Sequence, residues 1–417
     1  MDAFDTVVIG AGHAGLAVSN LLSEAGRDHV VVERGRVAER WRSERWDSLH
    51  LLTPNWMTRL PGHVYAGPDP DGYMSAPQLV RHLQGYAASF RAPVLTDTTV
   101  LEVTADGDGY RVETDRGTWR AASVVIATGA SGRPNTPVPL DRLDPGVHVL
   151  TASGYRNPAQ LPAGGVLVVG ASSSGVQLAD ELARAGREVV LAVGRHTRIP
   201  RRYRGMDVFW WLERTGRLAR TIESVADVEA ARREPSLQLV GRGEVAGLAA
   251  NLDLGTLQGL GIRLAGHVAA LDGRTVRLLD DLEHSIQDAE RRMVRLLDSV
   301  DRHIDGCGLT AEVWPVLRPR PVPRPSTPSS IDLRAEGIGT ILFATGYRPH
   351  HPWLRVPVTA PDGSIVQRRG VTPAPGIYVV GQRFQHRRDS GFIDGARHDA
   401  RAVVDHLCGA GIPSRVR

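Results

Sequence analysis

The stretch Asp5-Thr-Val-Val-Ile-Gly-Ala-Gly-His-Ala-Gly-Leu-Ala-Val-Ser-Asn-Leu-Leu22 decides the fold of this 417-residue chain. A β-branched run precedes three glycines in G-x-G-x-x-G spacing, and an apolar pattern of helical period follows them. Gly10 permits a tight turn, Gly12 lets the backbone approach a pyrophosphate, and Gly15 lets the helix pack on the strand. The stretch therefore predicts a strand–turn–helix unit that binds a dinucleotide.

The next predicted strand, at residues 29–32, ends at Glu33. A carboxylate at this place can accept hydrogen bonds from a ribose, whereas it would repel a phosphate on the 2′-hydroxyl. We therefore expect the first unit to bind a nucleotide with a free 2′-hydroxyl. A glycine turn that binds nothing is the alternative, and the two flanking strands and the acid argue against it.

Residues 164–182 repeat the opening pattern, with Gly170 at the tight turn, Ser172 in place of the middle glycine and Gly175 at the helix-packing position. The second strand of this unit ends at Arg195, and an arginine there suits a 2′-phosphate. The two units are therefore predicted to bind different nucleotides. Further positive charge near the second unit is expected from His196, Arg198, Arg201 and Arg202. A solvated surface loop is the alternative for this basic group.

All 50 basic residues are arginines, and they are scattered among 46 acidic residues, which leaves a net charge of +4. The lack of lysine excludes Schiff-base chemistry of the pyridoxal-phosphate kind and phosphate-loop hydrolases. Scattered charge argues against a nucleic-acid surface. Cys307 and Cys408 form no C-x-x-C pair, which excludes a redox dithiol of the thioredoxin-reductase type, and no metal site is expected.

The length of the chain predicts two or three domains. The first strand begins too close to the N-terminus to leave room for a signal peptide, and no apolar run reaches membrane-spanning length. We therefore expect a cytoplasmic protein that takes a small-molecule substrate and binds neither membrane nor nucleic acid. A homodimer is left open.

Short alternating segments with Asp-Gly and Arg-Gly turns at residues 93–120 predict a small β-meander. Residues 280–304 have helical period and many i,i+4 charge pairs. The proline-rich residues 314–328 predict a connector at a domain crossing, and a lid formed by residues 280–328 is the alternative.

The segment after Glu33 is rich in arginine and tryptophan. Trp41, Trp46 and Trp56 are candidates for an aromatic wall against a flat ring system, and packing within the loop is the alternative. Two buried strands end in the same three residues, Ala-Thr-Gly, at 127–129 and 344–346. A last strand and helix are predicted at 376–381 and 395–407, and they can bring backbone amides back to the first nucleotide.

These features resemble the two-dinucleotide-binding-domain flavoproteins and, within them, the class B flavin monooxygenases. The resemblance spans nearly the whole chain. It is carried by residues 10–15 with Glu33, 33–41, 51–54, 127–129, 170–175 and 343–347. The last of these, Phe-Ala-Thr-Gly-Tyr, is the most specific motif.

The resemblance implies an α/β fold of two Rossmann-like dinucleotide-binding domains, the NADPH-binding domain inserted in the FAD-binding domain, with a small β-meander. The implied ranges are 1–157 for the first part of the FAD-binding domain, 158–330 for the NADPH-binding domain and 331–417 for the second part of the FAD-binding domain. Glu33 assigns FAD to the first unit, and Arg195 assigns NADPH to the second.

The resemblance also implies NADPH- and O₂-dependent oxygenation of a small organic substrate through a flavin hydroperoxide. The family motif between the domains has a histidine where this chain has Thr151, and an aromatic residue at Tyr155. Tyr155 favours oxygenation at nitrogen or sulfur over Baeyer–Villiger insertion, and the missing histidine weakens that preference. Two further functions use the same nucleotide units and stay open: an NADPH-dependent flavin reductase or oxidase, and a regulatory flavoprotein.

Asn55 and Tyr347 are the candidate catalytic residues, as polar contacts near the flavin and the nicotinamide, with purely structural roles as the alternative. The expected cofactor contacts are Gly10, Gly12, Gly15, Glu33, Arg34, Trp41, Thr53, Ala127, Thr128, Gly129, Gly170, Ser172, Ser174, Gly175, Arg195, Arg201, Gly381 and Gln382.

Overall fold

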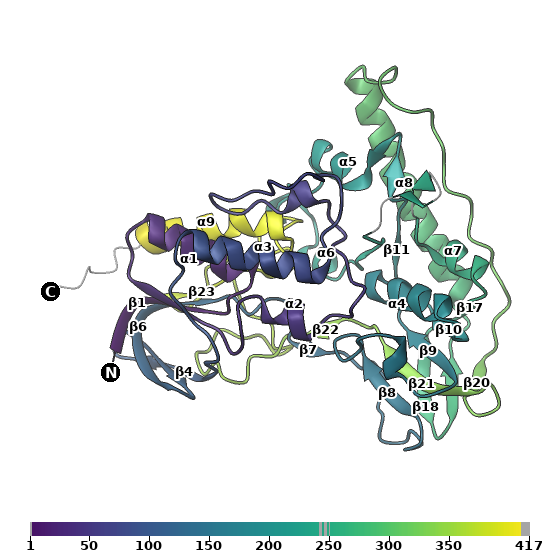
Figure 1. Ribbon diagram of the computed structural model, residues 1–417, viewed down its shortest axis with the longest axis horizontal. Coiled ribbons are helices and arrows are strands. Elements are labelled where there is room, and N and C mark those ends of the chain that lie inside the picture. The colour runs from purple at the N-terminus through teal and green to yellow at the C-terminus, as the bar shows by residue number, and fades with distance from the viewer. Residues whose placement is uncertain (1, 242–243, 246–247, 250, 410–417) are drawn as a thin grey trace.

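The described residues fold around two large, mainly parallel β-sheets that lie on opposite sides of the molecule (Figure 1). The computed structural model describes residues 2–241, 244–245, 248–249 and 251–409. Each sheet is built on one of the two glycine units, so the predicted α/β fold class is confirmed. None of the helices in these residues combines the length and the apolar composition that a membrane span requires.

The first sheet has parallel strands in the order β3-β2-β1-β6, and β23 pairs with the C-terminal part of β6. These strands are β1 (Asp2–Ile9), β2 (His29–Val32), β3 (Val94–Leu95), β6 (Gly117–Ile126) and β23 (Ile377–Val379). The N-terminal part of β6 pairs antiparallel with β5 (Gly109–Thr114), and β5 pairs with β4 (Val100–Asp106). This antiparallel extension is the predicted β-meander.

The first sheet is accompanied by α1 (His13–Glu24), α3 (Ala76–Ser89) and α9 (Ile393–Gly409) (Figure 1). Leu16 of α1 and Val8 of β1 are fully buried in one cluster that also contains residues of α3 and α9. α3 begins with a capping box, in which Ser75 Oγ accepts from the Gln78 N–H and the Gln78 side chain accepts from the Ser75 N–H. The apolar periodicity of the sequence therefore sets the buried faces of these helices.

The second sheet is wholly parallel, in the order β17-β10-β9-β21-β8. Its strands are β8 (His148–Thr151), β9 (Gly165–Val169), β10 (Val189–Ala192), β17 (Arg263–Ala265) and β21 (Ile338–Phe343). It is accompanied by α4 (Ser173–Arg184), α7 (Leu254–Gly259) and an antiparallel ribbon of β18 (Val268–Asp272), β19 (Thr275–Leu278) and β20 (Ser330–Asp332). The strand order matches that of the first sheet, so the sequence repeat is also a structural repeat.

The sheet pairing crosses the predicted domain ranges, which stay a prediction. β8 pairs with β21 in the second sheet, although the range 1–157 assigns β8 to the first domain. β21 also belongs to the second sheet, although the range 331–417 assigns it to the FAD-binding domain. We therefore propose that the chain crosses at residues 127–135 and returns at 344–348, where β7 (Arg133–Pro134) pairs with β22 (Tyr347–Arg348). The end of the last range, residues 410–417, lies outside the described residues.

A long excursion between β10 and β17 and between β19 and β20 carries α5 (Val208–Arg214), α6 (Val228–Arg232) and α8 (Leu282–Gly306). Its short strands are β11 (Thr197–Arg198), β12 (Arg202–Tyr203), β13 (Met206–Asp207), β14 (Leu237–Gln238), β15 (Glu244–Val245) and β16 (Leu248–Ala249). The small helix α2 (Glu39–Ser43) follows β2, and single 3-10 turns are Asn55–Met57, Pro158–Gln160 and Ile222–Ser224.

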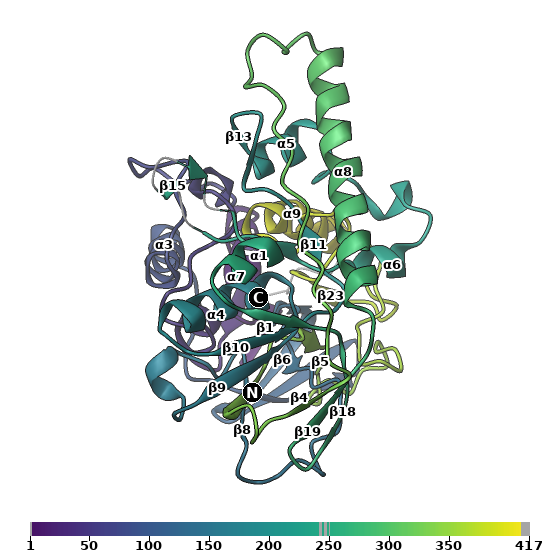
Figure 2. The ribbon, with the colours of Figure 1, turned by 90° about the vertical axis from the view of Figure 1, so that its right-hand side faces the viewer.

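The proline-rich residues 314–328 do not form a domain crossing. They run back along α8 to β20 (Figure 2). Arg318 donates to Asp298 of α8 at 2.8 Å, and the Val322 N–H donates to Glu290 of α8 at 2.8 Å. Proline leaves the segment few backbone donors, so its contacts with α8 depend on side chains. The segment therefore forms a strap along α8.

Each glycine turn packs against the end of the neighbouring strand. A Cβ atom on Gly10 would lie 2.7 Å from the carbonyl oxygen of Ala127, and one on Gly170 would lie 2.7 Å from that of Ala344. A Cβ atom on Gly175 would overlap the carbonyl oxygen of Gly170. The repeated Ala-Thr-Gly residues are thus the strand ends on which the two turns rest.

Gly175→Ala is expected to lower the free energy of unfolding by about 1–3 kcal/mol, because its methyl group must displace backbone. Gly85→Ala in α3 is the matched control, because Gly85 is exposed and its Cβ would meet nothing within 4 Å. Alanine is favoured over glycine inside a helix, so Gly85→Ala should raise stability by roughly 0.5–1 kcal/mol. Urea unfolding of both variants measures the difference, and equal stabilities would contradict the close packing at Gly175.

Candidate functional site

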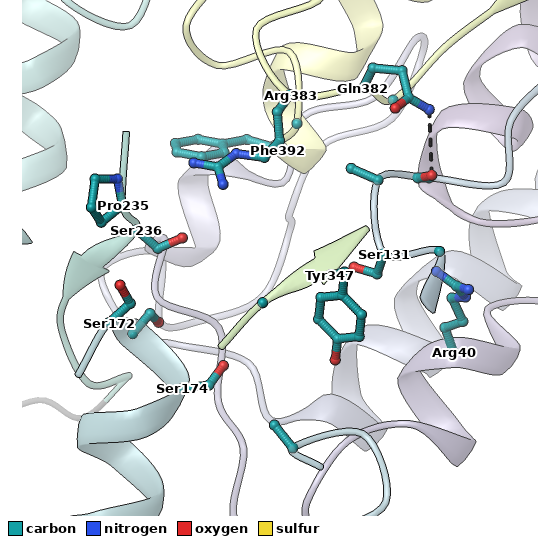
Figure 3. A pocket seen from close by; sticks show the side chains of 18 of the residues that line it. Arg40, Ser131, Ser172, Ser174, Pro235, Ser236, Tyr347, Gln382, Arg383 and Phe392 are labelled. Carbon is teal, nitrogen blue, oxygen red and sulfur yellow. Dashed lines mark hydrogen bonds between the residues drawn. The ribbon is translucent and has the colours of Figure 1, made fainter. Parts of the chain in front are cut away.

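Both glycine turns open into one continuous cavity of about 1730 Å³ (Figure 3). Its wall contains residues of both turns, of both Ala-Thr-Gly segments, and of α5, α8 and α9. Pockets for one small ligand usually measure about 300–1,000 Å³. The cavity therefore has room for more than one ligand.

The first turn presents free backbone donors to the cavity. Gly12 is the N-cap residue of α1, and no side chain caps this helix. Gly12 lines the cavity, and a Cβ atom on it would meet nothing within 4 Å. The first N–H groups of α1 are therefore available to an anion such as a pyrophosphate, and the helix dipole adds to the attraction.

Glu33 at the end of β2 fixes the first turn. Its Oε2 accepts a hydrogen bond from the Ala11 N–H at 2.8 Å, and its Oε1 accepts one from the Gly35 N–H at 3.1 Å. The side chain also lines the cavity. Each carboxylate oxygen retains a second lone pair, so the predicted contact to a ribose is compatible with the geometry.

The second turn has the same geometry. Gly170 has a φ angle of +106°, against +108° at Gly10. Ser172 is the N-cap residue of α4, and its side chain makes no capping hydrogen bond. Ser172 and Ser174 both line the cavity (Figure 3). A second anion site of the same kind therefore opens into the same space.

Arg195 is exposed, follows β10 and lines the cavity. Arg292 and Arg295 of α8 also line it. Burial lowers the pKa of Arg292, and the charges of Arg195 and Arg295 lower it further. Arg292 donates from Nη2 to the carbonyl oxygen of His196 at 2.7 Å. Three cations from two elements therefore lie in one region, which suits a phosphate group.

His196 and Arg198 do not add free positive charge beside Arg195, contrary to expectation. His196 is 1% exposed, and burial lowers its pKa to about 4, so its ring is neutral at pH 7. Arg198 is buried and forms ion pairs with Asp253 at 2.7 Å and Glu290 at 3.3 Å. Burial keeps His196 uncharged, and two carboxylates balance the charge of Arg198.

The structure also corrects the prediction that Arg201 contacts a cofactor. Arg201 is 1% exposed and is absent from the cavity wall. Its Nε donates to Asp207 at 2.8 Å, its Nη1 donates to the Leu52 carbonyl at 2.8 Å, and its guanidinium stacks 4.5 Å from the Tyr73 ring. Arg201 thus joins the loop after β2 to the excursion. Arg202 is likewise absent from the cavity wall.

The predicted aromatic wall is reduced to Trp41, which lines the cavity with the Arg45 guanidinium 5.1 Å from its ring. Trp46 is 5% exposed and packs in the core beside the second sheet. Trp56 lies outside the cavity wall, next to Arg59. Packing within the loop therefore describes Trp46 and Trp56.

Asn55 has a structural role. It is 4% exposed, lies outside the cavity wall, and uses both ends of its amide: Nδ2 donates to the Asp69 carbonyl and Oδ1 accepts from the Met74 N–H, each at 2.8 Å. These two hydrogen bonds tie Asn55 to Asp69 and Met74 of the same loop. Tyr347 of β22 lines the cavity (Figure 3) and stays a candidate for substrate or cofactor contact.

The two family-motif positions, Thr151 and Tyr155, have different surroundings in the structure. Thr151 lines the cavity, with its hydroxyl 3.1 Å from the hydroxyl of Ser153. Tyr155 is fully buried in the core beside the second sheet, and burial raises the pKa of its hydroxyl. Tyr155 therefore does not reach the cavity, and the preference for nitrogen or sulfur rests on the place of Tyr155 in the family motif and stays a prediction.

The remaining predicted contacts in the cavity wall are Arg34, Thr53, Ala127, Thr128, Gly129, Gly381 and Gln382. Gln382 Nε2 donates to the Gly129 carbonyl at 3.4 Å, which ties the last strand end to the first Ala-Thr-Gly segment (Figure 3). Gly15 and Gly175 lie outside the wall, at the helix-packing positions behind the turns.

Sequence analysis missed the arginines of α8. Arg292, Arg295 and Arg302 lie at positions i, i+3 and i+10, so they share one helix face, and all three line the cavity. The i,i+4 charge pairs of this helix predict a solvent-exposed face and give no sign of a face that lines a cavity. A search for like charges at the spacing of one helix face would have found the three arginines.

Two glycine-turn units that open into one cavity are typical of oxidoreductases that bring two nucleotide cofactors together. Residues 7–219, just over half of the chain, match the model of the pyridine nucleotide-disulphide oxidoreductase family. The chain belongs to this family.

Relatives extend the match to nearly the whole chain. A CzcO-like uncharacterised oxidoreductase of Geobacillus kaustophilus is 28% identical over 97% of this chain and 98% of its own. The indole-3-pyruvate monooxygenase YUCCA1 of Oryza sativa subsp. japonica is 28% identical over 90% of this chain and 86% of its own. A solved flavin-containing monooxygenase from Stenotrophomonas maltophilia superposes with a TM-score of 0.66 at 19% identity, covering 98% of this chain and 99% of that chain. The predicted resemblance to flavin monooxygenases is confirmed.

Gly12→Val is expected to give protein that has lost most of its flavin, because the side chain would enter the space in front of α1, where a Cβ atom meets no protein atom within 4 Å. The flavin absorbance of the purified protein measures the loss. Ser172→Val, the matching change in the second turn, should keep the flavin. Full flavin retention in Gly12→Val would show that the first turn is not the flavin site.

Proposed function

We propose that this protein is an NADPH- and O₂-dependent flavin monooxygenase that oxygenates a small organic substrate, at nitrogen or sulfur. The observation that carries the proposal is the shared cavity, which joins two uncapped helix N-termini with Glu33 beside one and Arg195 beside the other. Membership of the family and the similarity to flavin monooxygenases support it.

The residues present fit FAD at the first unit and NADPH at the second. The N–H groups at the start of α1 would hold the FAD pyrophosphate, and Glu33 its ribose. Those of α4 would hold the NADPH pyrophosphate, with the 2′-phosphate at Arg195 and Arg292. When bound, the flavin supplies hydride acceptance and the activation of O₂.

His13 adds no formal charge to the first anion site. It is the first residue of α1 and lines the cavity, and burial lowers its pKa to about 4. The ring is therefore neutral at pH 7, and it adds no charge to the positive end of the helix dipole. The positive end of the helix dipole therefore supplies the attraction for a pyrophosphate, and a neutral imidazole can still donate one hydrogen bond.

The distribution of cysteine disfavours disulfide reduction, the reaction in the name of the family. Such an enzyme passes electrons through a thiol close to the flavin. In the described ranges, no cysteine lines the cavity, and Cys307 and Cys408 are both exposed. Oxygenation of a substrate at a bound flavin would need no such thiol.

The proposal is tested by supplying the holoenzyme with NADPH and ¹⁸O₂ in the presence of an organic sulfide, a tertiary amine or a ketone. We expect ¹⁸O in the sulfoxide or the amine oxide. Labelled ester from the ketone would show a Baeyer–Villiger enzyme instead. Hydrogen peroxide equal to the NADPH consumed, without labelled product from any substrate, would replace the proposal with an NADPH oxidase.

Arg195→Ala is expected to raise the KM for NADPH about ten- to a hundredfold and to leave the KM for NADH nearly unchanged, because a charged hydrogen bond to the 2′-phosphate is lost. Arg116→Ala, at an exposed position outside the cavity, is the control. Steady-state kinetics with both nucleotides measure the effect. Equal losses for NADPH and NADH would remove Arg195 as the 2′-phosphate ligand.

A further inference from the structure

One end of the cavity combines unpaired cations with an apolar wall. This α5–α8 end is lined by Phe209, Leu212, Arg217, Leu218, Leu296 and Arg302. Within the described part of the chain, neither Arg217 nor Arg302 forms an ion pair with a carboxylate. The Arg217 side chain donates from Nη2 to the Ser299 hydroxyl of α8, at 3.0 Å. Burial lowers the pKa of Arg217, and the charges of Arg220 and Arg302 lower it further.

The carboxylates that line this end are already paired. Glu234, whose charge also acts on Arg217, forms an ion pair with Arg388 at 2.9 Å. Asp298 forms an ion pair with Arg318 of the strap at 2.8 Å. Both carboxylates therefore leave Arg217 without a counter-ion in direct contact.

Other buried arginines of the described chain do form ion pairs with carboxylates. Arg198 and Arg201 are more deeply buried than Arg217, and both have carboxylate partners. A partly desolvated cation without a partner costs stability. An anion from outside the chain would supply the missing partner at Arg217.

This anion is distinct from the 2′-phosphate assigned to Arg195. Arg302 lies ten residues beyond Arg292 on α8, which is about 15 Å along the helix axis. Arg292 interacts with Arg195, whereas Arg302 interacts with Arg217. One phosphate group is too small to bridge both pairs. The face of α8 therefore serves two separate anions.

The wall beside Arg217 is apolar. Phe209, Leu212 and Leu218 belong to one buried cluster, against which Leu296 of α8 and Phe392 pack. The rings of Phe209 and Phe392 meet edge to face, with centroids 5.9 Å apart. Phe392 lines the cavity (Figure 3). A ligand that pairs with Arg217 would therefore place the rest of its body against hydrocarbon and aromatic surface.

We propose that the α5–α8 end is the substrate site and that the substrate is an organic carboxylate with an apolar or aromatic body. The carboxylate pairs with Arg217 and Arg302, and the body lies against Phe209 and Phe392. The inference rests on the proposed function, because it names the substrate of that reaction. Most of this site is formed by α5 and α8 of the excursion, and Phe392, directly before α9, adds one wall.

The test is a titration of oxidised holoenzyme, saturated with NADP⁺, by isothermal calorimetry. The probe is 3-phenylpropanoate, and the neutral reference of the same size is 3-phenylpropanamide. We expect the carboxylate to bind about tenfold more tightly than the amide. The double variant Arg217→Gln with Arg302→Gln should bind both equally, and Arg217→Lys should keep part of the preference. Arg116→Gln is the control for loss of an arginine elsewhere.

Two results would overturn the inference. One is equal affinity of the wild type for the carboxylate and the amide. The other is an equal loss of NADP⁺ and carboxylate affinity in Arg217→Gln, which would assign the residue to the nucleotide. Neither depends on turnover. A carboxylate preference without ¹⁸O transfer to any substrate would instead refute the proposed function, and ¹⁸O transfer without a carboxylate preference would refute only the inference.

Discussion

Both nucleotide units depend on one contact, the packing of a glycine turn on the carbonyl end of the neighbouring strand. At Gly10 and at Gly170 a side chain would lie 2.7 Å from an alanine carbonyl, so the turn can rest there only if that side chain is absent. The contact fixes where α1 and α4 begin. Because neither helix has a side-chain cap, its first N–H groups are left for a ligand. A packing requirement thus leaves backbone donors free at the start of each helix.

The same strand ends are the places where the chain changes sheets. After residues 127–129 it continues through β7 to β8 of the second sheet, and after residues 344–346 it returns through β22. β7 and β22 pair, and the Thr345 hydroxyl donates to the Asn135 carbonyl. Since each crossing starts beneath a glycine turn, both turns open into one cavity. Two cofactors can therefore meet there.

The parts of the fold that local sequence determines were predictable: the two glycine units, the meander, and the position of Glu33. The fate of isolated polar residues was not. Whether Arg198 is a free cation depends on Asp253, which is distant in sequence, and Asn55 is occupied by backbone groups of another part of its loop. The bounds of the domains depend on pairing between distant strands, as between β8 and β21, which local sequence does not reveal.

Because arginine is the sole basic side chain apart from histidine, charge alone does not separate structural from functional cations in this protein. Pairing does. Arg201, held by Asp207 and the Leu52 carbonyl, has no capacity left for a ligand and joins two parts of the fold. Arg217 is less buried, yet it lacks a carboxylate in direct contact among the described residues, and the neighbouring arginines repel it. A partly buried cation without a counter-ion lowers the stability of the fold, and a bound anion would offset that loss. The unpaired arginines, and not the most buried ones, are therefore the ones with capacity left to bind an anion.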